Sequence, residues 1–392
     1  MTNDVQIFAE TIEPEALAQI EALAEHPVSD GSKIRIMPDV HAGAGCTIGT
    51  TMTITDRVCP NLVGVDIGCG MFAVKLDETK IDYAELDKVI RSSVPSGMMI
   101  RTKPVAAFDF DKLRCPVADK QRALLSLGTL GGGNHFIEID KDSCGGLWLI
   151  IHSGSRHLGL EVANYYQQLA VKRISTPPAD LIKDIAKTYK EQGRQNEIQE
   201  AIEKVKAQYR DAKKQKDLAY LEGQDLDDYL NDMGIVQQYA KANREAIANE
   251  ILRGMSLKHS GWLFHTTHNY IDLQNKILRK GAVSAQLGEY LVIPMNMRDG
   301  VFLCTGLGNP DWNYSAPHGA GRIMSRKKAK ETISAEDYVA SMEGIFTTSV
   351  GYGTIDEAPM AYKDADEIRK LIRPTCGVID LMKPQYNFKA SE

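Results

Sequence analysis

A glycine-rich turn between Val63 and Met71 constrains this chain more than any other stretch. It holds Asp66 and Cys69, three residues apart. Glycine adopts backbone conformations that a Cβ forbids, so these two side chains can converge on one point. A carboxylate and a thiolate that meet can bind a metal ion. A tight turn around a buried free cysteine is the simpler alternative, and the rest of the chain has to decide between them.

Four histidines elsewhere share a setting in turns marked by glycine or asparagine: His135, His152, His268 and His318. With the carboxylate and the thiol of the first turn they form a pool of six candidate ligands, of which two metals bridged by one thiolate would use five. Imidazole and thiolate suit zinc or iron, whereas a carboxylate favours manganese, so residue types leave the metal open. Three more are interpreted as structural: His26, His259 and His265.

Residues 318–322 differ from the other histidine segments because they stand ahead of an expected basic helix at 323–332. A histidine followed by small residues at a helix start offers a nucleophilic nitrogen beside free backbone N–H groups. Those groups and the helix dipole favour phosphate, and Arg322 can neutralise more of its charge. An incidental histidine at a helix N-terminus is the alternative.

A run of glycines at 131–133 leads into an alternating strand expected at 134–139. In that strand Asn134, Phe136 and Glu138 share one face, and His135 and Ile137 share the other. Near the N-terminus, His41 beside Asp39 could supply two ligands, but a hydrogen-bonded structural pair is the interpretation we favour.

The composition is that of an ordinary globular protein, with 43% hydrophobic and 25% charged residues in 392. No apolar run is long enough to span a bilayer, and the N-terminus lacks the features of a signal peptide. Seven scattered cysteines suit a reducing compartment, so we expect a cytoplasmic protein with no membrane association. Because the net charge is −6, any nucleic-acid binding must rely on a local site.

Charged residues crowd and glycine thins between residues 176 and 255, where apolar residues recur at helical spacing. We expect a helical insertion there, which could be an antiparallel hairpin broken near Gly193. Its charged faces are most simply solvated. With no internal repeat or linker in view, one α+β domain over residues 1–392 is the simplest organisation. Helices are expected at 14–24 and 83–91, and strands at 34–41, 71–76, 147–151 and within 276–294.

Seven segments together resemble the RtcB family of RNA ligases, in order and spacing, from about residue 30 to the C-terminus. They are 37–41, 65–71, 133–138, 152–156, 268–270, 279–285 and 318–322. The resemblance implies an RtcB-like domain around a dinuclear metal centre. It also implies an enzyme that joins RNA ending in a 2′,3′-cyclic phosphate or 3′-phosphate to RNA beginning with a 5′-hydroxyl, using GTP and manganese.

The resemblance assigns two manganese ions to one set of ligands with a bridging thiolate. These ligands are Asp66, Cys69 and His135 for one ion and Cys69, His152 and His268 for the other. His318 would attack the α-phosphate of GTP and become guanylylated. The guanylyl group would then pass to the RNA 3′-phosphate, and the 5′-hydroxyl would displace GMP.

The same resemblance implies nucleotide contacts along several segments. They are Asn134, His135, Phe136, Ile137, Glu138, His268, Asn269, Pro294, Met295, Asn296, Met297, His318, Gly319, Ala320, Gly321, Tyr362 and Lys389. Glu138 would accept hydrogen bonds from guanine N1 and N2, and Arg156 and Arg322 would contact RNA phosphate. The family's usual Gly-Ser-Met turn is replaced by 295–297, which puts the nucleotide contacts there in question.

Two other functions remain open at this point. A dinuclear phosphoesterase would open cyclic phosphates without joining ends and would need the metal ligands but neither His318 nor Glu138. A non-catalytic RNA-binding partner would need neither metal nor nucleotide. The natural RNA, the oligomeric state and any activating protein are not specified by the residues.

Overall fold

A large antiparallel sheet forms the centre of the computed structural model, which describes residues 4–390 and, for 210–215, the backbone only. Its strand order is β13-β14-β17-β6-β7-β5-β9, and β16 adds a short parallel pairing to β17. The strands are β5 (Gly70–Leu76), β6 (Phe136–Lys141), β7 (Leu147–Ser153), β9 (His259–Thr267), β13 (Tyr290–Asn296), β14 (Gly300–Gly306), β16 (Phe346–Thr347) and β17 (Cys376–Lys389). The strand expected at 134–139 therefore begins two residues later, at Phe136.

A second, five-stranded sheet lies beside the first, in the order β1-β2-β3-β11-β10. Its strands are β1 (Asp4–Ile7), β2 (Lys33–His41), β3 (Ile48–Thr53), β10 (Asn269–Asp272) and β11 (Ile277–Lys280). Two small sheets pair β4 (Arg57–Val58) with β8 (Leu221–Glu222) and β12 (Ala282–Ser284) with β15 (Ser315–Pro317).

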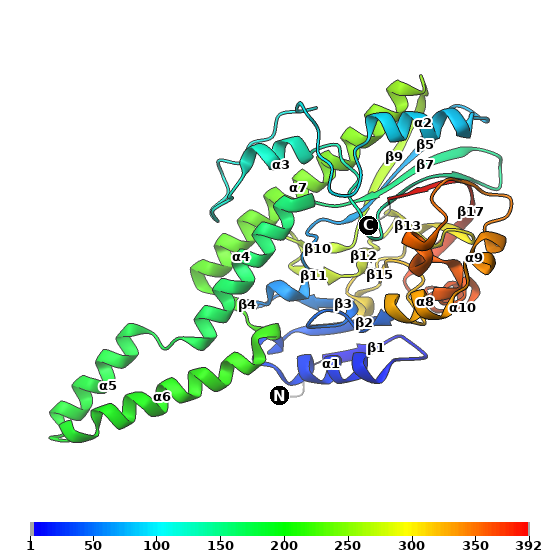
Figure 1. Ribbon diagram of the computed structural model, residues 1–392. Coiled ribbons are helices and arrows are strands. Elements are labelled where there is room, and N and C mark those ends of the chain that lie inside the picture. Colours follow the sequence, from blue (N-terminus) through cyan, green and yellow to red (C-terminus); the bar gives the residue numbers. More distant parts are fainter. Residues whose placement is uncertain (1–3, 391–392) are drawn as a thin grey trace.

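Helices cover the sheets on several sides (Figure 1). The α-helices are α1 (Pro14–Glu25), α2 (Tyr83–Ser93), α3 (Lys120–Ser126), α4 (Arg156–Ser175), α5 (Ala179–Glu191), α6 (Ile198–Ala212), α7 (Gly223–Gly254), α8 (Arg326–Thr332), α9 (Ala335–Ser341) and α10 (Ala365–Leu371). Short 3-10 turns are η1 (Pro27–Ser29), η2 (Pro60–Leu62), η3 (Gln195–Glu197), η4 (Lys213–Leu218), η5 (Pro310–Trp312), η6 (Tyr352–Glu357) and η7 (Pro359–Ala361). The α+β class expected from the sequence is confirmed. Within residues 4–390, no helix has the length and apolar character that spanning a bilayer requires.

Local sequence explains why α2 forms and which way it faces. Asp82 caps its N-terminus, because its carboxylate accepts hydrogen bonds from the backbone N–H groups of Ala84 and Glu85. Leu86 and Ile90 lie four residues apart on one face and are fully buried. They pack with residues of α7 against one face of the large sheet.

The long helix α7 is the main support beneath the large sheet. Its buried residues include Tyr239, Ile247 and Ile251, and it contacts both β7 and β5. The other face of the large sheet encloses a separate cluster around Trp148 and Ile150. Side chains of β6 on this face therefore lie between the apolar cluster and the uncovered end of the sheet, where a ligand could bind.

Most residues from 176 to 255 lie in helices, interrupted by turns and by the short strand β8, and they divide into two parts. Helices α5 and α6 form an antiparallel arm that projects from the body (Figure 1). No residue of α5 is buried, and the break between the two helices contains Gly193 with φ of 73°. Helix α7, in contrast, belongs to the core, so the projecting part is shorter than the expected insertion.

Candidate metal centre and nucleotide pocket

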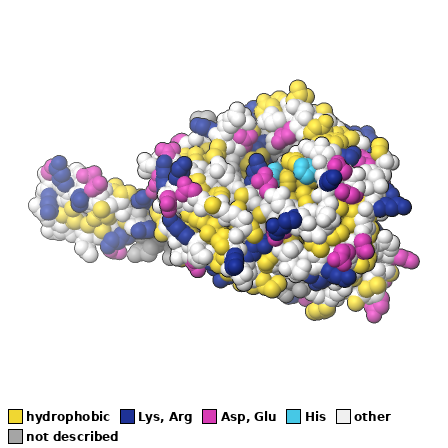
Figure 2. All heavy atoms as spheres, turned by 90° about the horizontal axis from the view of Figure 1, so that it is seen from above, with side chains coloured by type: hydrophobic (Ala, Val, Ile, Leu, Met, Phe, Trp, Pro, Cys, Tyr) yellow, Lys and Arg dark blue, Asp and Glu magenta, His cyan; other side chains and the backbone are white. Residues whose placement is uncertain are grey.

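Five side chains from distant parts of the chain meet at the open end of the large sheet. They form two groups that share the thiol of Cys69. The groups are Asp66, Cys69 and His135, and Cys69, His152 and His268. Within each group the ligand atoms lie within 4.8 Å of one another. Figure 2 shows histidine in a hollow on this face, with acidic and basic side chains around it.

Hydrogen bonds at Nδ1 orient two of the imidazole rings so that Nε2 faces the thiol. His135 Nδ1 lies 2.9 Å from the carbonyl oxygen of Leu130, and His152 Nδ1 lies 3.1 Å from that of Asn134. A ring that donates from Nδ1 keeps an unprotonated Nε2. These Nε2 atoms lie 3.4 and 3.3 Å from the sulfur of Cys69.

Two of the ring nitrogens of the second group face each other at hydrogen-bond distance. His152 Nε2 is 3.4 Å from His268 Nε2, and burial lowers the pKa of both rings well below the usual value. Nδ1 of His268 has no hydrogen-bond partner among the described residues. Neutral rings whose lone pairs converge on a thiol are satisfied by a cation between them. The donor set therefore fits a bound metal.

The carboxylate and the thiol differ in their readiness to ionise. Burial opposes ionisation of Asp66, but the neighbouring His135, whose Nε2 lies 3.0 Å from Oδ2, helps to hold the pKa of that carboxyl below the usual range. Burial and the charge of Asp66 raise the pKa of the Cys69 thiol. A bound cation would reverse that effect, because a coordinating thiol loses its proton.

The turn that carries Asp66 and Cys69 fits closely against its surroundings. Gly68 has φ of 75°, and a Cβ there would lie 2.8 Å from the Cβ of Ala240. A Cβ on Gly154 would lie 2.1 Å from Oδ1 of Asp66. Glycine is required at both positions, because any larger residue would displace the ligand turn.

Two neighbouring residues of α7 hold the ligand-bearing loops in place. The fully buried guanidinium of Arg244 donates from Nη1 to the carbonyl oxygens of Gly68 at 2.7 Å and Ser153 at 2.9 Å. Asn243 bonds to the backbone of Thr129 and Gly154. The sequence does not indicate this role, because helical spacing in α7 predicts packing but not which loops the helix contacts.

His318 lies beside the second ligand group, and its ring centroid is 4.9 Å from that of His268. Its Nδ1 is 2.6 Å from Oδ2 of Asp39, a side chain with no exposed surface. The same oxygen accepts hydrogen bonds from the backbone N–H groups of His318 and Gly319. The Nε2 atom is therefore left unprotonated and free to act as a nucleophile.

The expectation that His318 stands at a helix start is wrong. His318 follows β15 directly, and α8 begins at Arg326 with Ser325 as its N-cap. Glycine at 319 and 321 lets this segment continue as a loop packed against Asp39, because a Cβ at Gly321 would meet the Asp39 backbone. The dipole of α8 therefore does not act on His318. The expected structural pairing of His41 occurs through the Asp39 backbone oxygen, 2.9 Å from His41 Nδ1.

A cavity of about 730 Å³ opens next to His318 and the second ligand group. Most of the expected nucleotide-contact residues line it: Asn134, Phe136, Glu138, His268, Pro294, Met295, Asn296, Met297, His318, Gly319, Ala320, Gly321, Tyr362 and Lys389. Arg322 lines it as well. His41, expected as a structural partner of Asp39, also lines it, together with residues that no sequence motif marks, among them Arg326, Glu357 and Asn387.

Some expected site residues lie away from this cavity. Ile137 is buried in the apolar core with α2 and α7, and His135 faces the metal ligands. Asn269 accepts a hydrogen bond from the Gly281 N–H. Arg156 packs on Gly131 and bonds to Thr129 Oγ1 at 3.2 Å, so its guanidinium is largely enclosed by loops.

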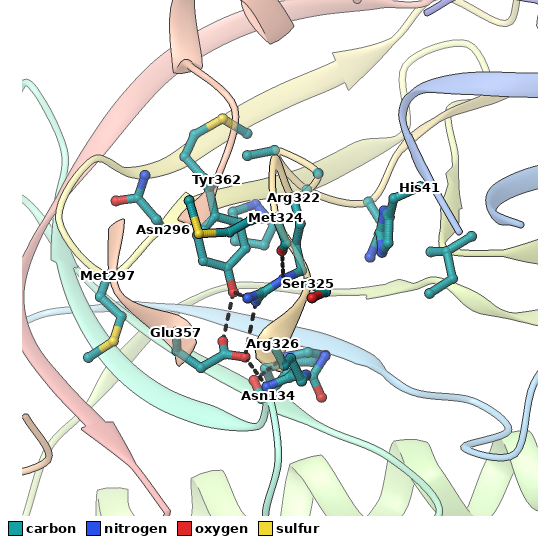
Figure 3. Close-up of a pocket in the computed structure, with 18 of the residues that line it drawn as sticks. His41, Asn134, Asn296, Met297, Arg322, Met324, Ser325, Arg326, Glu357 and Tyr362 are labelled. Carbon is teal, nitrogen blue, oxygen red and sulfur yellow. Dashed lines mark hydrogen bonds and ion pairs between the residues drawn. The ribbon is translucent and has the colours of Figure 1, made fainter. Parts of the chain in front are cut away.

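Figure 3 shows one wall of the cavity, where Glu357 lies among cationic side chains. Its carboxylate is 2.5 Å from Arg326 Nη1 and 3.6 Å from Arg322 Nη1. It also accepts a hydrogen bond from the Tyr362 hydroxyl at 2.7 Å and pairs with Lys389. Across the floor, Asn387 Nδ2 donates to Glu138. The wall is thus rich in positive charge and the floor presents a carboxylate.

The fold brings together two groups of metal ligands with a common thiol, a histidine nitrogen without a partner and a cavity wall rich in positive charge. Together they define a candidate site for metal-assisted phosphate chemistry. The sequence matches the family described as tRNA-splicing ligase RtcB over residues 19–115 and 109–390. The chain therefore belongs to the RtcB family.

Curated relatives agree with this assignment. RNA-splicing ligase RtcB of Escherichia coli strain K12 is 33% identical over 377 residues, which cover 86% of this chain and 84% of that protein. RNA-splicing ligase RtcB1 of E. coli strain ATCC 25922 has the same identity and coverage. The tRNA-splicing ligase RtcB of Aeropyrum pernix is 25% identical over 434 residues, covering 86% of this chain and 83% of that protein.

Proposed function

We propose that this protein is an RNA ligase of RNA repair or tRNA splicing. It joins an RNA end that carries a 2′,3′-cyclic phosphate or a 3′-phosphate to an RNA end with a 5′-hydroxyl, and it consumes GTP and uses two manganese ions. The relatives named as RNA-splicing or tRNA-splicing ligases support the joining of RNA. The observation that carries the proposal is the position of His318, which lies beside His268 of the second ligand group. The thiol of Cys69 belongs to both ligand groups.

The proposed cofactor suits the donor set. Asp66, Cys69 and His135 would hold one ion and Cys69, His152 and His268 the other. Oxygen and imidazole donors suit manganese, and the thiolate is the softer exception. Bound there, the ions would neutralise charge on phosphate oxygens and so favour nucleophilic attack at phosphorus.

His318 and Asp39 would carry the covalent step. Asp39 holds the proton on Nδ1, so that the Nε2 lone pair can attack the α-phosphate of GTP. A bond from nitrogen to phosphorus forms, and the bond to pyrophosphate breaks. A 2′,3′-cyclic end is first hydrolysed by water to a 3′-phosphate. The guanylyl group then passes from His318 to the RNA 3′-phosphate as the bond from nitrogen to phosphorus breaks, and the RNA 5′-hydroxyl displaces GMP to form the new phosphodiester.

Glu138 and the cationic wall would bind the substrates. The Glu138 carboxylate would accept the N1 and N2 hydrogens of guanine, which adenine lacks in that arrangement. Arg322 lies by the His318 loop and, with Arg326, would contact phosphate oxygens. Arg156 is the weaker of the expected RNA contacts, because loops enclose most of its guanidinium.

Incubation with α-labelled GTP and manganese tests the proposal. The wild-type protein should become labelled and His318→Ala should not, and RNA with the stated ends should be joined only by the wild type. Wild-type protein that holds metal but never labels would refute the ligase mechanism. Release of phosphate without joined RNA, unaffected by His318→Ala, would point instead to a phosphoesterase.

A further inference from the structure

Asp39 fixes the orientation of two histidines at the cavity. Its side chain holds Nδ1 of His318, and its backbone carbonyl oxygen lies 2.9 Å from Nδ1 of His41. Both histidines line the cavity, and Figure 3 shows His41 on the side away from Asn296 and Met297. The proposed covalent step uses only His318, so the chemistry of the second imidazole is unassigned.

The proton on the His41 ring can be placed from its partner. A carbonyl oxygen only accepts hydrogen bonds, so Nδ1 must carry the hydrogen and Nε2 the lone pair. Among the described residues Nε2 has no hydrogen-bond partner, and it is not sealed from solvent. A basic nitrogen is therefore available to a molecule bound in the cavity.

The surroundings of His41 favour its neutral form at physiological pH. Burial lowers the pKa of His41 below its ordinary value of 6.5, and the hydrogen bond to Asp39 opposes that effect. His318 and Arg322 lower the pKa further, because another positive charge beside them is unfavourable. These three residues are the charged or titratable groups that act most on His41. A neutral imidazole with a free Nε2 can accept a proton without first losing one.

Only two steps of the proposed reaction require a hydroxyl group to lose its proton. His318 attacks through a lone pair, and the guanylyl group passes to an anionic phosphate oxygen. The water that opens a cyclic phosphate and the RNA 5′-hydroxyl that displaces GMP must each be deprotonated. A metal ion can lower the pKa of bound water to about 7, so the 5′-hydroxyl has the greater need of a base from the protein.

We propose that His41 is the general base of the joining step, an inference that deepens the proposed ligase function and rests on it. Nε2 of His41 accepts the proton of the RNA 5′-hydroxyl while the hydroxyl oxygen forms a bond to the phosphorus of the RNA 3′-phosphate. The bond from that phosphorus to the GMP oxygen breaks, and GMP leaves with the electron pair. His41 then releases the proton to water. His318 thus carries the guanylyl group, and His41 activates the second RNA end.

An RNA that already carries the guanylylated 3′-phosphate isolates this step, because joining it to a 5′-hydroxyl RNA needs neither GTP nor the His318 nucleophile. In the full-length protein, His41→Asn keeps an amide that can donate to the Asp39 carbonyl oxygen but supplies no basic nitrogen. Joining of this RNA should slow by about a hundredfold or more, whereas labelling of His318 by GTP should stay near the wild-type rate. His259→Ala is the control, because His259 is exposed and lies outside the cavity.

Two further measurements separate a base from a structural role. Added imidazole should restore joining in His41→Ala, because the free base can occupy the vacated space and accept the proton. In the wild type the joining rate should be nearly constant between about pH 7 and 8, since His41 is already neutral there, and in His41→Asn it should rise with pH.

Joining of the activated RNA by His41→Asn at the wild-type rate would overturn the inference. Equal losses of His318 labelling and of joining, without recovery on addition of imidazole, would also overturn it, because His41 would then only support the fold around Asp39. Wild-type protein that joins neither the activated RNA nor the unmodified ends would instead contradict the proposed ligase function, before any variant is compared.

Discussion

Asp39 Oδ2 lies 2.6 Å from His318 Nδ1, although 279 residues separate the two in the chain. The carboxylate is fully buried and also accepts the His318 backbone N–H. This pair fixes both the orientation of the imidazole and the nitrogen that carries its proton.

Replacing Asp39 with Asn should slow covalent labelling of His318 by GTP by about a hundredfold or more, in the range of a lost acid–base partner. An amide can donate to Nδ1 and so favour the wrong tautomer. Single-turnover labelling measures the rate. Manganese content and thermal unfolding should stay close to wild type, and an unchanged labelling rate would show that Asp39 has no part in preparing the nucleophile.

Replacing Cys69 with Ser should abolish binding of both metal ions, because one sulfur belongs to both ligand groups. In the wild type, manganese at about 100 times its dissociation constant should stabilise the fold by about 2.7 kcal/mol. Thermal unfolding with and without manganese detects this difference. Cys46→Ser is the control, since Cys46 is also buried but lies outside the cluster. Full stabilisation by manganese in Cys69→Ser would contradict a shared thiolate.

The affinity for GTP should rise with pH through about 7. Burial raises the Glu138 pKa to that value from an ordinary 4.5, so the side chain is protonated below it and ionised above it. Only the ionised form accepts both N–H groups of guanine. In Glu138→Gln the affinity should be weak and nearly independent of pH across the same range. Calorimetric titrations with GTP at several pH values measure this dependence. If the affinity of wild type and of Glu138→Gln changed with pH in the same way, Glu138 would not be the group that titrates.

Replacing Arg244 with Met should destabilise the fold by about 2–5 kcal/mol, because two buried carbonyl groups lose their donor. Urea unfolding of the metal-free protein measures the effect. Lys241→Met lies on the same helix but is solvent-exposed and should change stability by less than about 0.5 kcal/mol. Equal stabilities for the two variants would mean that Arg244 does not hold the ligand loops.

Replacing the arm at 179–209 with a short glycine–serine linker should leave the body folded and its metal binding intact. No residue of α5 is buried, and the hairpin returns the chain to the body. Loop length alters closure entropy only slowly, so the cost of the change is small. Circular dichroism and manganese titration check the outcome, and loss of metal binding would reveal a coupling between the arm and the site.

Much of the local structure could be predicted from the sequence. The strand from Lys33 to His41 and the helix from Tyr83 to Ser93 follow from periodicity and capping, which act over a few residues. The sequence pattern predicts a helix from residue 323, three residues before α8 begins, because Gly319 and Gly321 are equally compatible with a helix start and with a loop. That loop is chosen by its packing on Asp39, which the local sequence does not reveal.

The candidate site was only partly predictable for the same reason. Glu357 and Arg326 carry charge that could equally belong to a solvated surface, and only the fold places them around one cavity. In the sequence, Asn243 and Arg244 are indistinguishable from other polar residues of a charged helix. In the structure they hold the loops that bear the candidate metal ligands.

The amino-acid sequence alone determined which donors this protein possesses and which short segments present them, because side-chain chemistry and glycine turns are local properties. Only the tertiary structure decided that Asp39 serves His318, that Lys389 is held by Glu357, and that α7 is core. Each of these depends on distances between residues far apart in the chain, and such distances are set by how the sheets and α7 pack together.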